Sequence, residues 1–163
     1  MLVFYLLTFI VCGAYVVLML SYLIGWNKTA VYDGTKDSRQ ATRVSIILPV
    51  RNEEKNILNI LNCLALQEYP KELYEILVVD DFSEDGTTAL ISTLDFSNLK
   101  MISLANKGGK KKAIEAGISK ATGTLIVTTD ADCEMGTGWI STIVSFYEEH
   151  RPKIIVGPVV LSG

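Results

Sequence analysis

The stretch that decides the fold is ILVVDDFSEDGT, residues 76–87. Its first half is apolar and rich in β-branched side chains, and its second half changes to acids, a glycine and hydroxyl groups. A short apolar run that ends in turn-forming residues predicts a strand, Tyr74–Asp80, that is buried on both faces. This strand would deliver two adjacent acids, Asp80 and Asp81, to a polar loop.

The same alternation continues on both sides of this stretch. Apolar runs of similar length predict further strands at Val44–Val50, Leu99–Leu104, Thr124–Thr129 and Lys153–Leu161. Between them, apolar residues recur every three or four positions, which predicts helices after an Asn52 N-cap, over Thr87–Leu94, from about Lys110 and over Gly138–Glu149. Strands this apolar, alternating with helices, predict an α/β fold: a Rossmann-like, mostly parallel sheet with helices on both faces.

Two of these helices have apolar faces that can be written residue by residue. The first helix carries Ile57, Ile60, Leu61 and Leu64 on one face. The helix from Lys110 carries Ile114, Gly117, Ile118 and Ala121 on one face. We expect both faces to pack on the sheet.

The amino-terminal segment, residues 1–26, has no charged side chain, and the first charge in the chain is Lys28. About 20 apolar residues suffice to cross a bilayer, so this segment is expected to be one transmembrane helix. A cleaved signal peptide is disfavoured because the segment lacks a basic start and a small-residue cleavage site. Residues 27–42 are polar and predict a juxtamembrane linker, and residues 43–163 predict the soluble domain.

Basic residues set the expected orientation of that helix. They follow it rather than precede it, at Lys28, Lys36, Arg39 and Arg43. The positive-inside rule then predicts a single-pass protein of the cell (inner) membrane with its soluble domain in the cytoplasm. The isolated cysteines Cys12, Cys63 and Cys133 suit a reducing compartment.

Composition excludes several classes of protein. The 163 residues are 49% hydrophobic and 20% charged, with a net charge of −3. This composition excludes a disordered chain, a collagen and a disulfide scaffold. The mildly acidic balance argues against nucleic acid as a partner, because binding to phosphate backbones needs a basic surface.

Polar clusters follow four of the predicted strands. They comprise Pro49 to Glu54, Asp80 to Thr87, Asn106 to Lys110, and Asp130 to Asp132. Ligands of open parallel sheets bind beyond the carboxyl ends of the strands. The sequence therefore predicts one crevice lined by all four clusters.

Asp130 and Asp132 are candidate metal ligands. Two acid-x-acid pairs are about what chance gives at this composition, so their place at a strand end carries the argument. In extended chain, side chains two apart point the same way, and two such carboxylates suit Mg²⁺ or Mn²⁺ together with phosphate oxygens and water. The alternative is a solvated turn in which Asp132 caps the next segment.

The other clusters suggest more than one role. One of Asp80 and Asp81 is expected to bind loop amides, and the other to accept hydrogen bonds from a base or ribose. Asp85 is expected to be a turn or helix cap. Gly108-Gly109 offers free N–H groups before a helix, and Lys110 adds a cation, a combination that favours phosphate.

Four segments taken in order, VSIILPVRNEE, ILVVDDFSEDGT, NKGGKKKAIEAGI and TTDADC, resemble the nucleotide-binding half of family 2 glycosyltransferases of the GT-A fold. The resemblance covers about residues 43–163. It implies transfer of a hexosyl group from a nucleotide-sugar donor, usually UDP-linked, with inversion at the anomeric carbon and a Mn²⁺ or Mg²⁺ cofactor. The membrane segment is similar to that of members that build polysaccharides or glycolipids, which implies a saccharide or lipid-linked acceptor.

The resemblance also implies roles for individual residues. Asp81 would bind the base, Asp130 the ribose or diphosphate, and Asp132 the metal, while Lys110 would lie near the donor phosphates. The nucleotide pocket would be lined by Pro49, Asn52 and Glu53. Arg51 stands where many members have an aromatic residue, and its guanidinium can also stack on a base.

In the family, an acceptor-side half with the general base follows the nucleotide-binding half. We therefore expect that base beyond Gly163 and expect this chain alone to transfer little sugar. Two other interpretations stay open: an inactive membrane-anchored nucleotide-binding scaffold, and a receiver-like signalling module, because ILVVDD also resembles the acidic pair of phosphoryl receivers.

Overall fold

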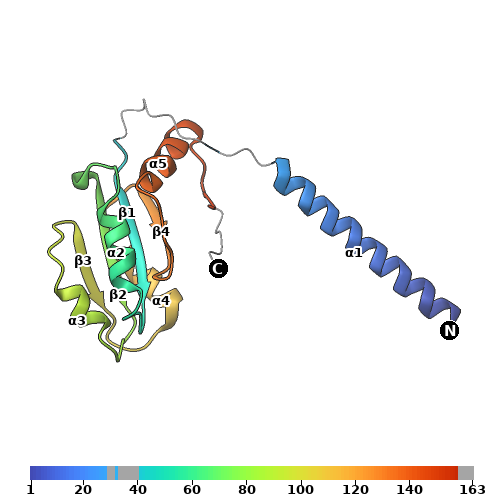
Figure 1. The fold of residues 1–163 in the computed structure, drawn as a ribbon, viewed down its shortest axis with the longest axis horizontal. Helices are drawn as coiled ribbons and strands as arrows, with labels where there is room; N and C mark the ends of the chain where they lie inside the picture. Colours follow the sequence, from blue (N-terminus) through green and yellow to red (C-terminus); the bar gives the residue numbers. More distant parts are fainter. Residues whose placement is uncertain (29–31, 33–40, 158–163) are drawn as a thin grey trace. The chain divides into compact units, whose positions relative to one another are not determined.

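The computed structural model describes residues 1–28, 32 and 41–157. The chain divides into two compact units, Met1–Asp33 and Gly34–Gly163, and each is described by itself (Figure 1). Most of the expected linker over residues 27–42 lies outside the described residues, including Lys36 and Arg39. Residues 27 and 28, the first two positions of that linker, are helical.

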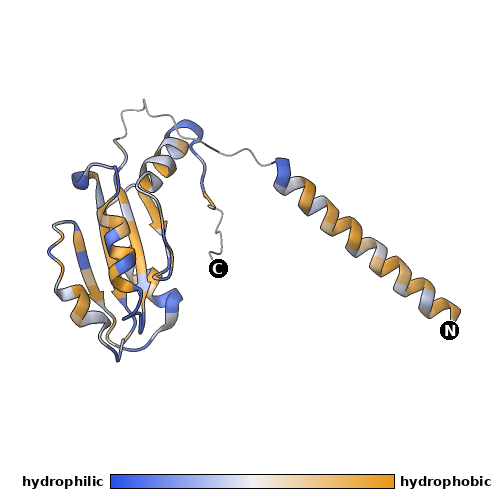
Figure 2. Ribbon diagram, viewed as in Figure 1, coloured by the Kyte–Doolittle hydropathy of each residue, from blue (hydrophilic) through white to orange (hydrophobic). Residues whose placement is uncertain are grey.

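The first unit is the helix α1, Leu2–Lys28. Figure 2 shows apolar residues along nearly its whole length, and none of its side chains is buried. Its 27 residues correspond to about 40 Å of helix, which is enough to cross a bilayer. The expected helix is confirmed as one that is long and apolar enough to span a membrane.

The second unit is built on a parallel sheet. Within residues 41–157 its strand order is β3-β2-β1-β4. The strands are β1 (Val44–Val50), β2 (Tyr74–Asp80), β3 (Leu99–Ser103) and β4 (Leu125–Thr128). Val44 is in register with both Tyr74 and Leu125, so the carboxyl ends of β1, β2 and β4 lie at one edge of the sheet.

The predicted fifth strand is wrong in the part that the structure describes. Residues 153–157 are irregular, and the rest of the predicted strand lies outside the described residues. Ile154 and Val156 are 80% and 88% exposed. A β-branched run does not form a strand without a neighbouring strand to pair with, and residues 153–157 have none.

Helices cover both faces of the sheet. They are α2 (Ile57–Ala65), α3 (Thr87–Ser92), α4 (Gly109–Lys120) and α5 (Trp139–His150), and a short 3₁₀ turn, Lys71–Leu73, leads into β2. Side chains of α2, α3 and α5 pack with one face of β1 and β2. On the other face, Ala113 of α4 packs with Ile47 and Val79 (Figure 1).

The predicted apolar face of α2 is confirmed, because Ile57, Ile60, Leu61 and Leu64 are all fully buried. The predicted start of this helix is wrong. Asn52 is not an N-cap: its backbone is left-handed, with φ of 54°, and the helix begins five residues later. Asn52 pairs instead with the loop after β2, as described below.

The predicted face of α4 is also partly wrong, because Ile118 is 46% exposed and Ala113 is buried in its place. The helix is therefore rotated about its axis relative to the prediction, and Gly117 explains why. A Cβ atom at Gly117 would lie 2.6 Å from Cγ2 of Ile47, so the helix approaches β1 with its backbone at this point. Ala113 lies one turn before Gly117 and therefore faces the sheet as well.

Candidate functional site

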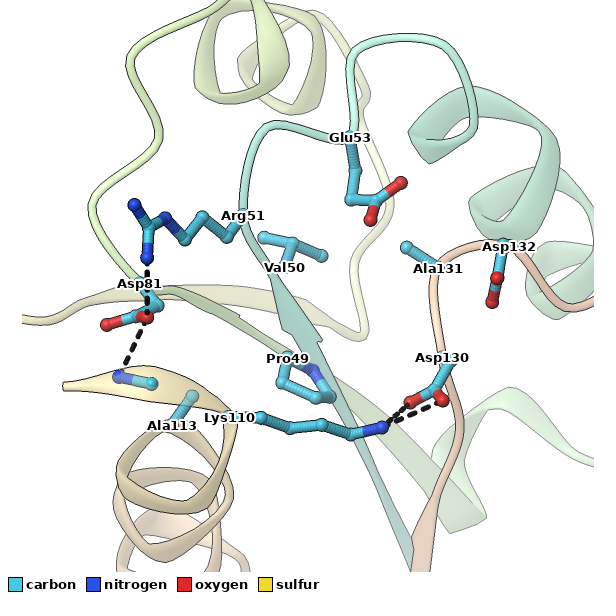
Figure 3. A pocket seen from close by; sticks show the side chains of 11 residues that line it. Pro49, Val50, Arg51, Glu53, Asp81, Lys110, Ala113, Asp130, Ala131 and Asp132 are labelled. Carbon is cyan, nitrogen blue, oxygen red and sulfur yellow. Dashed lines mark hydrogen bonds and ion pairs between the residues drawn. The ribbon is translucent and has the colours of Figure 1, made fainter. Parts of the chain in front are cut away.

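A cavity of about 320 Å³ lies at the carboxyl ends of β1, β2 and β4 and beside the start of α4 (Figure 3). It is lined by Pro49, Val50, Arg51, Glu53, Asp81, Gly109, Lys110, Ala113, Asp130, Ala131 and Asp132. Seven of the eight predicted site residues are therefore in one cavity. The exception is Asn52, which does not line it.

Asp81 joins the end of β2 to the start of α4. Its side chain is almost fully buried, and its two carboxylate oxygens accept hydrogen bonds from the N–H groups of Gly108 (2.6 Å) and Gly109 (2.9 Å). Gly109 has a φ of 79°, which favours glycine. The prediction that these two N–H groups are free for phosphate is therefore wrong, because Asp81 already binds them. The guanidinium of Arg51 lies 4.0 Å from the same carboxylate.

The neighbouring acids have structural contacts, as predicted. Asp80 accepts a hydrogen bond from the N–H of Ser83 (3.2 Å). Asp85 accepts hydrogen bonds from the N–H groups of Thr87 (3.0 Å) and Glu54 (3.2 Å). The hydrogen bond from the Thr87 hydroxyl is the main reason that the pKa of Asp85 is lowered.

The loop after β1 is fastened to the loop after β2, a feature that the sequence analysis missed. The Asn52 N–H donates to the Ser83 hydroxyl (3.0 Å), and the Asn52 side-chain oxygen accepts from the N–H of Glu84 (2.8 Å). The Glu53 N–H donates to the Thr87 hydroxyl (2.9 Å). These contacts fix the backbone on which Arg51 and Glu53 reach the cavity. The clustering of hydroxyls and acids around Gly86 was the available signal.

Lys110 crosses the cavity to Asp130. Its ammonium lies 2.7 Å from one carboxylate oxygen and 2.8 Å from the other (Figure 3). The two side chains are 61% and 50% exposed. Lys110 therefore contacts both oxygens of Asp130 at the open side of the cavity.

Asp130 and Asp132 lie in a turn rather than in extended chain, because the Cys133 N–H donates to the Asp130 carbonyl (3.2 Å). The expected extended geometry is therefore wrong, although both residues line the cavity. The alternative role of Asp132 as a cap is not supported: the next helix begins at Trp139, after a Gly138 N-cap.

Electrostatics of the cavity suit a hard divalent cation. Of the described residues that line it, four are carboxylates and two are basic, which leaves a net charge of −2. The described ranges contain no cluster of three or more His, Cys, Asp or Glu residues that would hold a metal by themselves. Oxygen ligands from Asp130 and Asp132 fit Mg²⁺ or Mn²⁺, which complete their shells with water and phosphate oxygens.

Curated relatives match much of the soluble unit. Glycosyltransferase AglE of Haloferax volcanii is 36% identical over 104 residues, which are 63% of this chain and 34% of AglE. Poly(ribitol-phosphate) beta-N-acetylglucosaminyltransferase TarS of Staphylococcus aureus is 32% identical over 116 residues, which are 70% of this chain and 20% of TarS. Dodecaprenyl-phosphate galacturonate synthase of Rhizobium johnstonii is 30% identical over 131 residues, with 76% and 38% covered. The chain thus spans 20% to 38% of the length of these relatives.

Solved structures share the fold. The crystal structure of S. aureus TarS 1–349 in complex with UDP-GlcNAc superposes with a TM-score of 0.63 at 32% identity, covering 67% of this chain and 32% of that one. The mannosyltransferase PcManGT from Pyrobaculum calidifontis, in complex with GDP-Man and Mn²⁺, gives 0.67 at 27% identity, covering 80% and 39%. The model of the family described as glycosyl transferase family 2 matches residues 45–163, so this chain, with its α/β GT-A-like fold, belongs to that family.

Proposed function

We propose that the chain is the nucleotide-sugar-binding part of a membrane-anchored, metal-dependent, inverting glycosyltransferase that uses a UDP-sugar. The observation that carries this proposal is the cavity at the strand ends, where Asp81, Lys110, Asp130 and Asp132 lie together. Support for the donor comes from the neighbours: TarS is described in complexes with UDP and with UDP-GlcNAc. The acceptor would be a saccharide or a lipid-linked molecule.

The nucleotide base is assigned to the end of the cavity formed by Asp81 and Arg51. Each oxygen of the Asp81 carboxylate accepts one backbone N–H and keeps a second lone pair. That lone pair can accept an N–H from a base. The flat guanidinium of Arg51, beside Asp81, offers a surface for stacking. Pro49 and Glu53 also line the cavity.

The diphosphate is assigned to the other side of the cavity, near Lys110, Asp130 and Asp132. A diphosphate would be repelled by a cavity of net negative charge. Mg²⁺ or Mn²⁺ held by Asp132 and Asp130 would supply the positive charge that stabilises a departing nucleoside diphosphate. Lys110 contributes a further positive charge at the same place.

The acceptor hydroxyl would attack the face of the sugar opposite the diphosphate. We assign the carboxylate that deprotonates this hydroxyl to the acceptor-side part of the family's fold, beyond Gly163. This chain by itself would therefore bind metal and nucleotide and transfer little sugar.

α1 is assigned as the membrane anchor of this enzyme. The support is its length, its apolar character and its lack of buried side chains. Basic residues follow the helix, which favours a cytoplasmic soluble unit at the inner membrane.

The test is a calorimetric titration of the 163-residue chain in detergent micelles with UDP, UDP-GlcNAc and GDP, with MnCl₂ or with EDTA. We expect UDP and UDP-GlcNAc to bind in Mn²⁺ and to bind at least tenfold more weakly in EDTA. Asp132→Asn should remove this dependence on metal, and Asp95→Asn, on an acid that does not line the cavity, should not.

Two outcomes would refute the proposal. Absence of any nucleotide binding would favour a membrane-anchored scaffold that keeps only the fold. Phosphorylation by acetyl phosphate, without uridine binding, would favour the receiver-like module.

A further inference from the structure

The ammonium of Lys110 lies between the two carboxylate oxygens of Asp130, where a metal cation chelated by that carboxylate would lie. Its ammonium nitrogen is nearly equidistant from the two carboxylate oxygens, at 2.7 Å and 2.8 Å. Figure 3 shows the side chain extended across the cavity from the start of α4 to reach this point. A divalent ion bound by both oxygens of Asp130 would have to lie where the ammonium lies.

Among the described residues that line the cavity there are two ion pairs, and the Lys110–Asp130 pair is one of them. Arg51 lies beside Asp81, and Lys110 lies on Asp130. Asp132 forms no ion pair within residues 41–157. The two pairs differ in exposure, because the Asp81 side chain is 4% exposed and both partners of the Lys110 pair are at least half exposed. The Lys110 pair is therefore the one that can exchange partners at low cost.

We propose that Lys110 competes with the divalent cation for Asp130 and releases that carboxylate when a diphosphate arrives. This inference rests on the proposed function, since it takes the diphosphate as the second partner of Lys110. The flexible stem and the three N–H donors of the ammonium allow it to exchange one anion for another within the cavity. No covalent step is involved.

The consequence is positive coupling between metal and nucleotide. Without nucleotide, the metal has to displace an ammonium from Asp130. With nucleotide, the ammonium is drawn to phosphate oxygens and the carboxylate is free. By linkage, the nucleotide then tightens the metal as much as the metal tightens the nucleotide. An exposed ion pair of this kind corresponds to a change in affinity of roughly two- to fivefold.

The experiment measures Mn²⁺ binding directly, from the electron paramagnetic resonance signal of free Mn²⁺, with the 163-residue chain in detergent micelles. Lys110→Met should bind Mn²⁺ roughly two- to fivefold more tightly than the unaltered chain when UDP is absent. Saturating UDP should tighten Mn²⁺ binding in the unaltered chain and should do so less in Lys110→Met.

Lys111→Met is the matched control. It removes the same charge one residue along α4, from a side chain that is 89% exposed and does not line the cavity. It should behave as the unaltered chain does. Lys110→Arg keeps a cation at the position, so it should keep weak Mn²⁺ binding in the absence of UDP. The circular dichroism spectrum of each variant should match that of the unaltered chain.

Equal Mn²⁺ affinities for Lys110→Met and Lys111→Met without UDP would overturn the inference, as would full UDP coupling in Lys110→Met. Failure of the proposed function is distinguishable: the unaltered chain would then not bind UDP at all, while the difference between the two variants in Mn²⁺ alone would remain.

Discussion

Substitution of Glu75 is the change whose effect on the free energy of unfolding can be derived most directly from the structure. This carboxylate of β2 is 9% exposed. One of its oxygens accepts hydrogen bonds from the Ser45 hydroxyl (2.7 Å) and from both the N–H (2.7 Å) and the hydroxyl (2.8 Å) of Thr122. The other oxygen binds the ammonium of Lys100 (2.9 Å). Glu75 thereby joins β1, β2, β3 and the turn before β4 at the edge of the sheet opposite the cavity.

The pKa of Glu75 gives the magnitude of its contribution to stability. Burial alone would raise it, but the hydrogen bonds from Ser45, Lys100 and Thr122 outweigh burial and lower the pKa from 4.5 to about 2. That shift corresponds to about 3 kcal/mol of stability supplied by the ionised group. Because the pKa is lower in the folded state, this stability is complete above pH 4.5 and is lost as the pH falls toward 2. About 2 kcal/mol should be lost between pH 5 and pH 3.

The assay is urea unfolding of the chain in detergent micelles, followed by circular dichroism at several pH values. Glu75→Gln should lower the free energy of unfolding by about 2–3 kcal/mol at pH 7, and the deficit should shrink below about 1 kcal/mol near pH 2. Glu72→Gln is the matched control, since Glu72 is exposed three residues earlier. A deficit in Glu75→Gln that is the same at pH 7 and pH 3 would refute the reasoning.

Three further substitutions follow from single contacts. Gly117→Ala places a Cβ 2.6 Å from Ile47 and should cost about 1–3 kcal/mol in urea unfolding. Tyr69→Phe removes the 2.6 Å hydrogen bond to the Thr42 carbonyl and should cost about 1 kcal/mol in the same assay. Asp85→Ala removes the hydrogen bonds that join the loops after β1 and β2, so the loop that carries Arg51 is less firmly held. Calorimetry should therefore record UDP binding weakened several-fold, with little change in the Mn²⁺ requirement.

The strands were predictable because burial on both faces leaves a local mark. β1 and β2 begin and end where the apolar runs do, β3 ends one residue before the predicted end, and β4 is one residue shorter than predicted at each end. The same rule failed at residues 153–157, because an apolar run indicates only a tendency to pair. Whether a neighbouring strand is present is a property of the rest of the fold.

The contacts of the site were less predictable than its members. The sequence indicated an acid at Asp81 and a pair of free amides at Gly108 and Gly109, each as a separate binding feature. Only the structure brings them together, across 27 residues, so that they bind one another. Glu75 was missed for the same reason, because its partner Ser45 lies 30 residues away in the sequence.

These contacts divide the cavity into a fixed part and an exchangeable part. Asp81 is buried and bound by backbone N–H groups, so its position is set by the fold and does not depend on a ligand. Lys110 is exposed and bound to a single exposed carboxylate, so its position can change without moving the backbone. A donor entering this cavity would therefore meet a preformed wall at the base end. At the diphosphate end it would meet a side chain that must move, and this is why the coupling of metal to nucleotide should depend on Lys110 and not on Asp81.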